Sequence, residues 1–267
     1  MHGKYKTTSD GKGSISDGFL QIIERKQNAS SKRFLPREER TEESRQVFLT
    51  CCEAISSALS TDGYRFAKSG PHCTKKHGDF SYKVSFLSDH YNVAGEHVAL
   101  TICGSVHSRK YKKWQTNLDL NNPSDYVAGG QIGYLTGDYL NFEWELAEPS
   151  VREEVVEGAI MAIRELAFPF FERFEFIDTV VKDVIAGRFP LSCHPVKDMK
   201  LLMFLAGCSA AREYATRCLI ENPGLQDEYL YEYRKYSGEG LYEVVSSEHS
   251  KALASAVHFF ELGNIEL

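Results

Sequence analysis

A run of basic and aromatic side chains near the middle of the chain has the clearest chemical potential. Residues 107–114 read HSRKYKKW, and the members that could act on a ligand are Arg109, Lys110, Tyr111, Lys112, Lys113 and Trp114. Lysine and arginine neutralise phosphates, and exposed aromatic rings stack on bases. The run therefore offers a nucleic-acid site. The alternative is a solvated loop whose two aromatic rings anchor it to the domain.

A second group is acidic and follows later in the chain. Its members are Asp138, Asn141, Glu143 and Glu145. Glu143 and Glu145 are two residues apart, which places them about 7 Å apart on one face of a strand. Paired carboxylates can transfer protons or bind a metal, and they can also meet a basic protein such as a nuclease toxin. The alternative is an ordinary hydrated surface.

Three further patterns resemble cofactor, metal or catalytic sites but lack the required context. The glycines of residues 129–133, GGQIG, lead into a strand, whereas a dinucleotide-binding loop opens a helix. His97 and Cys103 would lie roughly 20 Å apart along one strand, too far to share a zinc ion, which leaves His107 with a carboxylate as the alternative metal ligands. Adjacent side chains such as Cys193 and His194 mostly point apart, so we do not expect them to act as a nucleophile and its base. We therefore expect no cofactor, no metal and no catalytic residue among these patterns.

Strands predicted in the middle of the chain must position these groups. Apolar and polar residues alternate over residues 80–86, which is typical of a sheet with one buried face. The same holds for residues 98–106 and 140–146, and a short strand is expected at 64–67. A Gly-containing link at 135–139 predicts a hairpin between residues 132–134 and 140–146. Because the links are short, the pairing should be antiparallel.

Helices are predicted on both sides of this sheet. One should start near Thr41, with Glu42 and Glu43 in its first turn, and end before Asp62-Gly63. Ser150 and Glu153 have the spacing of a capping box that opens another, which Pro169 should kink or restart. The phenylalanines that come after it should join helices to sheet: Phe168, Phe170, Phe171, Phe174 and Phe176. Further helices are expected at 178–187, 195–222, 229–236 and 247–262.

Composition and charge limit the classes of protein to which the chain can belong. The chain has 267 residues and a net charge of −6, and 42% of its residues are hydrophobic, which suffices for a core. Residues 1–116 carry 19 basic and 12 acidic residues, and residues 117–267 carry 12 and 25. Seven cysteines without CxxC pairs and no apolar run at the N-terminus predict a cytoplasmic location. The most apolar stretch, residues 201–206, is far shorter than the ~20 residues of a membrane span, so none is expected.

These elements predict an α+β fold: an antiparallel β-meander of four to five strands packed by helices, with a helical C-terminal region. We expect three parts, a flexible basic segment at 1–40, an α+β domain at 41–177 and packed helices at 178–267. A short helical segment at 15–23 is the exception in the first part.

Residues 46–176 resemble an uncharacterised bacterial domain of unknown function. The resemblance rests on Gly63-Tyr64-Arg65-Phe66, on the strand at 80–86 and on the aromatic residues at 170–174. Domains of this kind often occur beside bacterial toxins or in defence loci, which implies an immunity or accessory role. The resemblance supplies no catalytic residue.

The sequence thus favours a non-enzymatic protein that binds another protein, in its most concrete form an immunity protein that neutralises a cognate toxin. The partner would meet the polar sheet face, or the acidic strands and C-terminal helices, and a basic toxin domain would suit them. Two alternatives remain open. One is a nucleic-acid-binding accessory protein that uses residues 109–114, and the other is an enzyme whose site assembles only in three dimensions.

Overall fold

The computed structural model describes residues 43–93, 95–120, 122–136, 140–191, 194–239, 249–263 and 265. The chain divides into two units, residues 1–41 and 42–267, and all of the described residues belong to the second. The segment expected at 1–40, with its helical turns at 15–23, lies outside the described residues. The three-part division stays a prediction.

The centre of this unit is an antiparallel sheet of six strands. Five follow the order β1-β2-β3-β4-β5, and β6 pairs with a different stretch of β4 from the one that pairs with β5. The α+β class and the meander predicted from the sequence are therefore confirmed. The strands are β1 (Arg65–Ala67), β2 (His72–His77), β3 (Phe80–Ser88), β4 (Ala99–His107), β5 (Tyr126–Gln131) and β6 (Trp144–Glu145).

Two details of the predicted sheet are wrong. The polar sequence of β2, HCTKKH, shows little alternation, and no strand was expected there. Residues 132–134 form a 3₁₀ turn instead of a strand, and β6 pairs with β4, so the hairpin expected around 135–139 is absent from the described sheet. The glycines of residues 129–130 lie inside β5, beside the shift of register at Val106 and His107.

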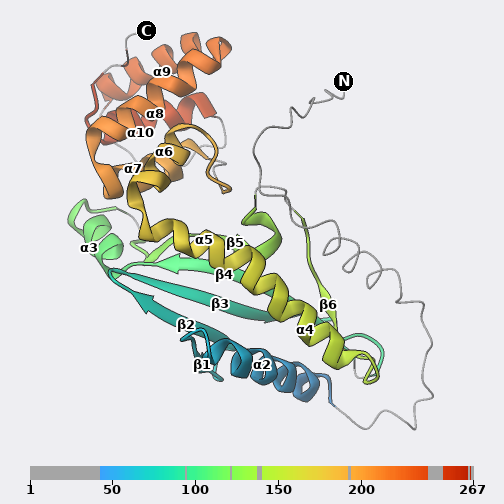
Figure 1. Ribbon diagram of the computed structural model, residues 1–267. Helices are drawn as coiled ribbons and strands as arrows, with labels where there is room; N and C mark the ends of the chain where they lie inside the picture. The colour runs from blue at the N-terminus through green and yellow to red at the C-terminus, as the bar shows by residue number, and fades with distance from the viewer. Residues whose placement is uncertain are drawn as a thin grey trace. The chain divides into compact units, whose positions relative to one another are not determined.

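One face of the sheet is apolar and buried. Tyr82, Val84 and Phe86 of β3 are buried, and they pair with Val106, Gly104 and Ile102 of β4. Paired residues share a face of an antiparallel sheet, so these side chains form one continuous layer. Figure 1 shows α2 (Ser44–Ser60), α4 (Arg152–Ala162) and α5 (Phe168–Glu172) crossing the same face. The alternation predicted for β3 and β4 is confirmed.

The aromatic side chains join this helix layer to the sheet. The rings of Tyr82 and Phe171 stack with centroids 5.1 Å apart, and those of Tyr64 and Phe168 stack at 5.2 Å. Phe170, Phe171 and Phe174 are buried as expected, whereas Phe176 is exposed because it lies where the chain turns into the next helix. The core therefore forms around residues 168–174.

A π-helical turn, η3 (Ile163–Ala167), connects α4 to α5. Pro169 lies at the first positions of α5, as the expected restart requires. The expected capping box is wrong, because the Ser150 hydroxyl bonds to the Glu148 carboxylate and Val151 occupies the cap position. The first helix also begins later than expected, at Ser44, without an acidic residue in its first turn.

The remaining helices are α3 (Arg109–Asn117), α6 (Ile177–Ile185), α7 (Pro195–Ala206), α8 (Cys208–Glu221), α9 (Gln226–Glu239) and α10 (His249–Phe259). Gly207 has a φ of 78° and separates α7 from α8, so the single helix expected at 195–222 is two. Short 3₁₀ turns lie at Arg173–Glu175 and Pro223–Leu225. Among the described helices, none combines the length and apolar character that crossing a membrane requires.

Candidate functional site

The second face of the sheet carries polar side chains, and the described helices of Figure 1 leave it without a covering layer. Lys83, Thr101 and Cys103 on this face are only partly buried. Because β3 and β4 are antiparallel, Phe80 and His107 lie near one end of the sheet, and Ser88 and Ala99 lie near the other. The eight residue steps of β4 separate these ends by about 26 Å.

One end is acidic. It consists of residues 87–98 and 140–157, which together contain eight acidic residues and one arginine. Figure 1 shows β6 and the start of α4 at this end and α3 at the opposite one. We call this region the acidic end.

Glu145 fixes the backbone of the acidic end. Its Oε1 accepts hydrogen bonds from the backbone N–H groups of Val98 (2.8 Å) and Ala147 (2.9 Å). Its Oε2 lies 2.5 Å from Nδ1 of His97. A carboxylate engaged in this way joins two strands and is not available to a partner.

Large apolar side chains are exposed at the end of β3 and in the loop between β3 and β4. Leu87, Tyr91 and Val93 are exposed, and Tyr91 keeps 71% of its surface accessible. The Asn92 side chain holds this loop, because it accepts from Ala99 N at 2.9 Å and donates to the Ser88 hydroxyl at 3.0 Å. The loop therefore presents its apolar side chains from an anchored backbone.

The four residues of the expected acidic group do not share one environment in the structure. Asn141 and Glu143 are exposed beside the buried Phe142 and Trp144, as the alternation predicts. Glu145 is the anchor between the two strands, and Asp138 lies outside the described residues. Of the four, Asn141 and Glu143 are the side chains shown to face solvent.

The opposite end of the sheet, which we call the basic end, contains residues 74–83, α3 and Asp125. Residues 109–117 form the helix α3 and not a loop, with Ser108 at its N-cap accepting from Tyr111 N. The Tyr111 ring is 7% exposed and packs on Trp114 and Phe204, with centroids at 5.6 and 4.9 Å. Burial raises the pKa of the Tyr111 hydroxyl to about 12. Both rings pack α3 against α7, with Tyr111 buried and Trp114 partly buried.

The cationic members of the run remain on the surface. Arg109, Lys110, Lys112 and Lys113 are all exposed on α3. Lys110 Nζ is 2.6 Å from the Asp79 carboxylate. The helix thus separates the charges of this sequence, which face solvent, from its aromatic rings, which join the core.

A hollow of about 520 Å³ lies at the basic end, between α3 and the polar second face of the sheet. The strand register explains its lining: Thr74 is opposite Lys83, Lys76 is opposite Ser81, and Ser81 is opposite His107. Four cationic side chains line it, Lys76, Lys83, Arg109 and Lys110, with two carboxylates, Asp79 and Asp125. His107 Nδ1 is 3.1 Å from Asp125, and its Nε2 is 3.0 Å from the Ser105 hydroxyl.

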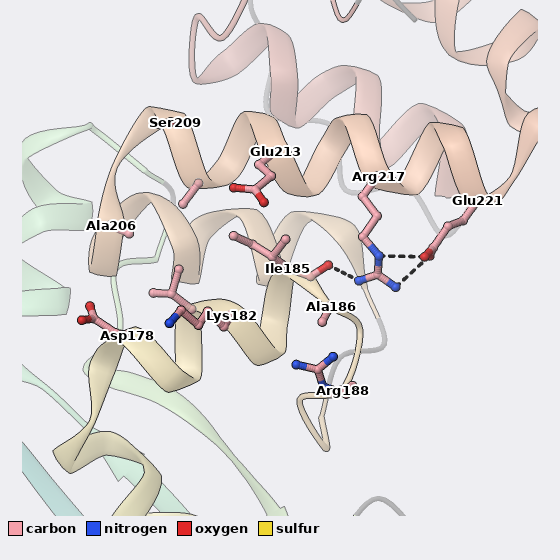
Figure 2. A pocket seen from close by; sticks show the side chains of 12 residues that line it. Asp178, Lys182, Ile185, Ala186, Arg188, Ala206, Ser209, Glu213, Arg217 and Glu221 are labelled. Atoms are coloured by element: carbon pink, nitrogen blue, oxygen red, sulfur yellow. Dashed lines mark hydrogen bonds and ion pairs between the residues drawn. The ribbon is translucent and has the colours of Figure 1, made fainter. Parts of the chain in front are cut away.

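A larger groove of about 750 Å³ lies between α6 and α8 (Figure 2). Its charges are mixed, with Asp178, Lys182, Glu213 and Arg217 among the lining residues. Figure 2 shows Arg217 bridging the helices: it donates to the Ile185 carbonyl and pairs with Glu221 at 2.8 Å. This arginine closes the C-terminal end of α6, so its charge serves the packing of the helices.

Burial keeps four of the described thiols in their protonated form. Burial raises the pKa of Cys52 to about 12 and also raises the pKa values of Cys73, Cys103 and Cys218, so these thiols stay protonated at neutral pH. Among the described residues, no three His, Cys, Asp or Glu side chains cluster in a way that could bind a metal ion. Cys193 lies outside the described residues.

Sequence reasoning found some of the side chains that distinguish the two ends, such as Arg109 and Glu143, and missed others. Lys83 was visible on the polar face of a predicted strand, but Lys76 was not, because β2 was not expected. Tyr91 and Val93 lie in a loop, and the periodicity of the sequence does not reveal which loop residues are exposed.

Comparison of the chain with protein-family models, with curated proteins and with solved structures gave no match. The resemblance of residues 46–176 to a toxin-associated bacterial domain therefore stays a prediction.

Proposed function

We propose that this protein is a non-enzymatic binding protein whose acidic end docks a basic protein, and that it acts as an immunity protein toward a toxin. The observation that carries the proposal is the exposure of three apolar side chains within a strongly acidic region, Leu87 at the end of β3 and Tyr91 and Val93 in the loop after it. The proposal that the partner is a toxin rests on the predicted family resemblance in addition to this surface.

The composition of the acidic end suits a protein interface. Interfaces concentrate their binding energy in a few aromatic side chains that become fully buried, and a polar rim surrounds them. Tyr91 would supply the aromatic centre, while Asn141 and Glu143 would supply exposed polar groups. Isolated exposed apolar residues are normal on a protein surface, but three within seven residues form a group.

The charge of this end selects a basic partner. Opposite potentials accelerate association and disfavour partners of the same charge. A toxin that cleaves nucleic acid must itself attract phosphates, so its active face is basic. An acidic end that covers such a face would block its substrate.

The backbone of the acidic end is prepared for binding. Asn92 joins the loop to Ala99 of β4 and to Ser88 of β3. Glu145 joins β6 to Val98, the residue before β4, and all of these hydrogen bonds are 2.8–3.0 Å long. A surface that is ordered before contact loses less entropy when it binds, which favours affinity.

The test is capture of partners by the full chain in its native host, followed by measurement of the recovered protein's toxicity. We expect a basic protein whose capture falls strongly with Tyr91→Ala and with Glu143→Lys. Tyr231→Ala is the matched control, because Tyr231 is 67% exposed on α9, away from the acidic end. Coexpression of the full chain should restore growth to cells that produce the captured protein.

Two outcomes would contradict the proposal. One is the recovery of no basic protein partner. The other is an equal loss of capture in Tyr91→Ala and Tyr231→Ala, which would place the contact outside the acidic end. If the partner binds at the acidic end but is harmless, the binding function stands and the toxin assignment fails.

A further inference from the structure

We propose that the hollow at the basic end binds a small phosphate monoester of about nucleotide size. This site lies at the opposite end of the sheet from the proposed protein interface and does not depend on it. The proposal rests on the hollow, on the cationic side chains that converge in it and on the start of α3 at its edge.

The cations of the hollow have different surroundings. Lys110 is paired with Asp79. Lys76, Lys83 and Arg109 have no ion pair or side-chain hydrogen bond with any other residue the structure describes. Three cations that come from β2, β3 and α3 thus share one hollow with only one of the two carboxylates engaged by a lysine. Unpaired like charges repel, and an anion between them would relieve that repulsion.

Hydroxyl groups add hydrogen-bond donors beside the cations. Thr74 and Ser81 line the hollow and lie opposite Lys83 and Lys76 in the sheet. A phosphate monoester presents several strong acceptor oxygens, and lysine, arginine and hydroxyl donors together suit such a group.

The first turn of α3 reinforces this preference. Ser108, Arg109 and Lys110 line the hollow, and the Ser108 hydroxyl caps the N–H of Tyr111. The backbone N–H groups of a helix start carry partial positive charge and are not satisfied within the helix. Here that charge adds to three cationic side chains, so the helix start is one component of a larger site.

Size and charge favour a compact ligand over a nucleic-acid strand. A volume of about 520 Å³ falls within the range typical of small-ligand sites. Asp79 and Asp125 border the hollow and would repel the next phosphates of a continuing strand. Tyr111 and Trp114 pack against Phe204, and neither ring lines the hollow, so neither is placed to stack on a base bound there. A single terminal phosphate satisfies the cations without meeting these obstacles.

The test is calorimetric titration of the full chain with AMP and phenyl phosphate, with adenosine as the unphosphorylated control. We expect both phosphate esters to bind, adenosine not to bind, and inorganic phosphate to displace the esters. Lys83→Gln and Arg109→Gln should each weaken binding about tenfold, since a hydrogen bond to a charged group is lost. Lys113→Gln is the matched control, because it removes a cation from α3 outside the hollow.

Circular dichroism and a melting curve should show that each variant folds. Absence of phosphate-dependent binding at millimolar ligand would overturn the proposal, as would equal losses in Lys83→Gln and Lys113→Gln. Binding of a single-stranded oligonucleotide that exceeds that of AMP and depends on Lys112 and Lys113 would also overturn it in favour of a nucleic-acid surface. Because displacement by inorganic phosphate is measured on the unmodified chain, the test does not depend on the variants.

Discussion

The acidic and basic ends belong to the same strands, yet they use their aromatic and charged residues in opposite ways. At the acidic end Tyr91 faces solvent, and the carboxylate of Glu145 accepts hydrogen bonds from backbone N–H groups. At the basic end Tyr111 is buried and the charges of Lys83 and Arg109 have no described partner. Residue type alone therefore does not identify a binding group. What matters is which of its atoms the fold has already engaged.

The largest expected effect concerns the strand that supports the basic end. Gly129 has a φ of 155°, and a Cβ there would lie 2.4 Å from the Gly104 carbonyl oxygen. Gly129→Ala should lower the free energy of unfolding by about 4 kcal/mol, because it adds backbone strain to a clash with β4. Urea denaturation would measure this.

Gly78→Ala is the control for that change. Gly78 has a φ of 56° but nothing within 4 Å of its Cβ position, so its cost should be only about 1 kcal/mol. Equal losses in the two variants would show that β5 does not approach β4 as described.

Comparison of Tyr91 with Tyr111 tests the two ends most directly. Tyr111→Ala should cost about 3 kcal/mol, because it leaves a cavity between α3 and α7. Tyr91→Ala should change stability by less than about 0.5 kcal/mol. Thermal and urea unfolding of both variants would decide, and a large loss in Tyr91→Ala would mean that the loop at 88–98 packs into the core.

Glu145 provides the corresponding test at the acidic end. Glu145→Ala should cost about 2 kcal/mol, because the N–H groups of Val98 and Ala147 lose their acceptor. Glu145→Gln keeps the amide oxygen as acceptor and should cost about half as much. If the two variants proved equally destabilised, the charge beside His97, and not the backbone hydrogen bonds, would be what holds this end.

Removing a cation from the hollow should raise the stability of the protein instead of lowering it. Lys83→Gln should raise stability by about 0.3 kcal/mol at low salt, because it relieves repulsion among unpaired charges. Added salt should remove the difference, which unfolding curves at two ionic strengths would measure. A loss of stability in this variant would indicate that Lys83 has a structural partner and is not held for a ligand.

The smallest effect at neutral pH is the titration of Tyr111. Its pKa is about 12 in the folded protein and about 10 when unfolded. A raised folded pKa contributes stability that is complete below about pH 10 and is lost as pH rises toward about 12. The stability of Tyr111→Phe should therefore fall less over this interval, and equal slopes would contradict the buried position of the hydroxyl.

The sequence predicted the sheet better than it predicted the two ends. Alternation in residues 80–86 and 98–106 gave the buried face because Tyr82, Val84 and Ile102 repeat with the period of a strand. Alternation in residues 140–146 predicted which residues are buried, but not that only Trp144 and Glu145 pair with β4. That pairing depends on distant backbone, which local pattern does not encode.

The candidate sites were harder to predict for a related reason. The run at 109–114 was recognisable by composition, but only the helical phase shows that Tyr111 turns inward while Arg109 and Lys112 turn outward. Glu145 was recognisable as acidic, but its hydrogen bond to Val98 joins residues 47 positions apart in sequence. Burial and partners of this kind come from tertiary contacts.

The π-helical turn at Ile163–Ala167 makes the chain unusually sensitive to its own length at one place. Each residue of a helix rotates the next residue by roughly 100° about the helix axis. Removing the exposed Glu165 from this turn would rotate Phe170, Phe171 and Phe174 away from β3 even though every core side chain remained. Insertions and deletions should therefore be tolerated far less here than in the connection between β3 and β4.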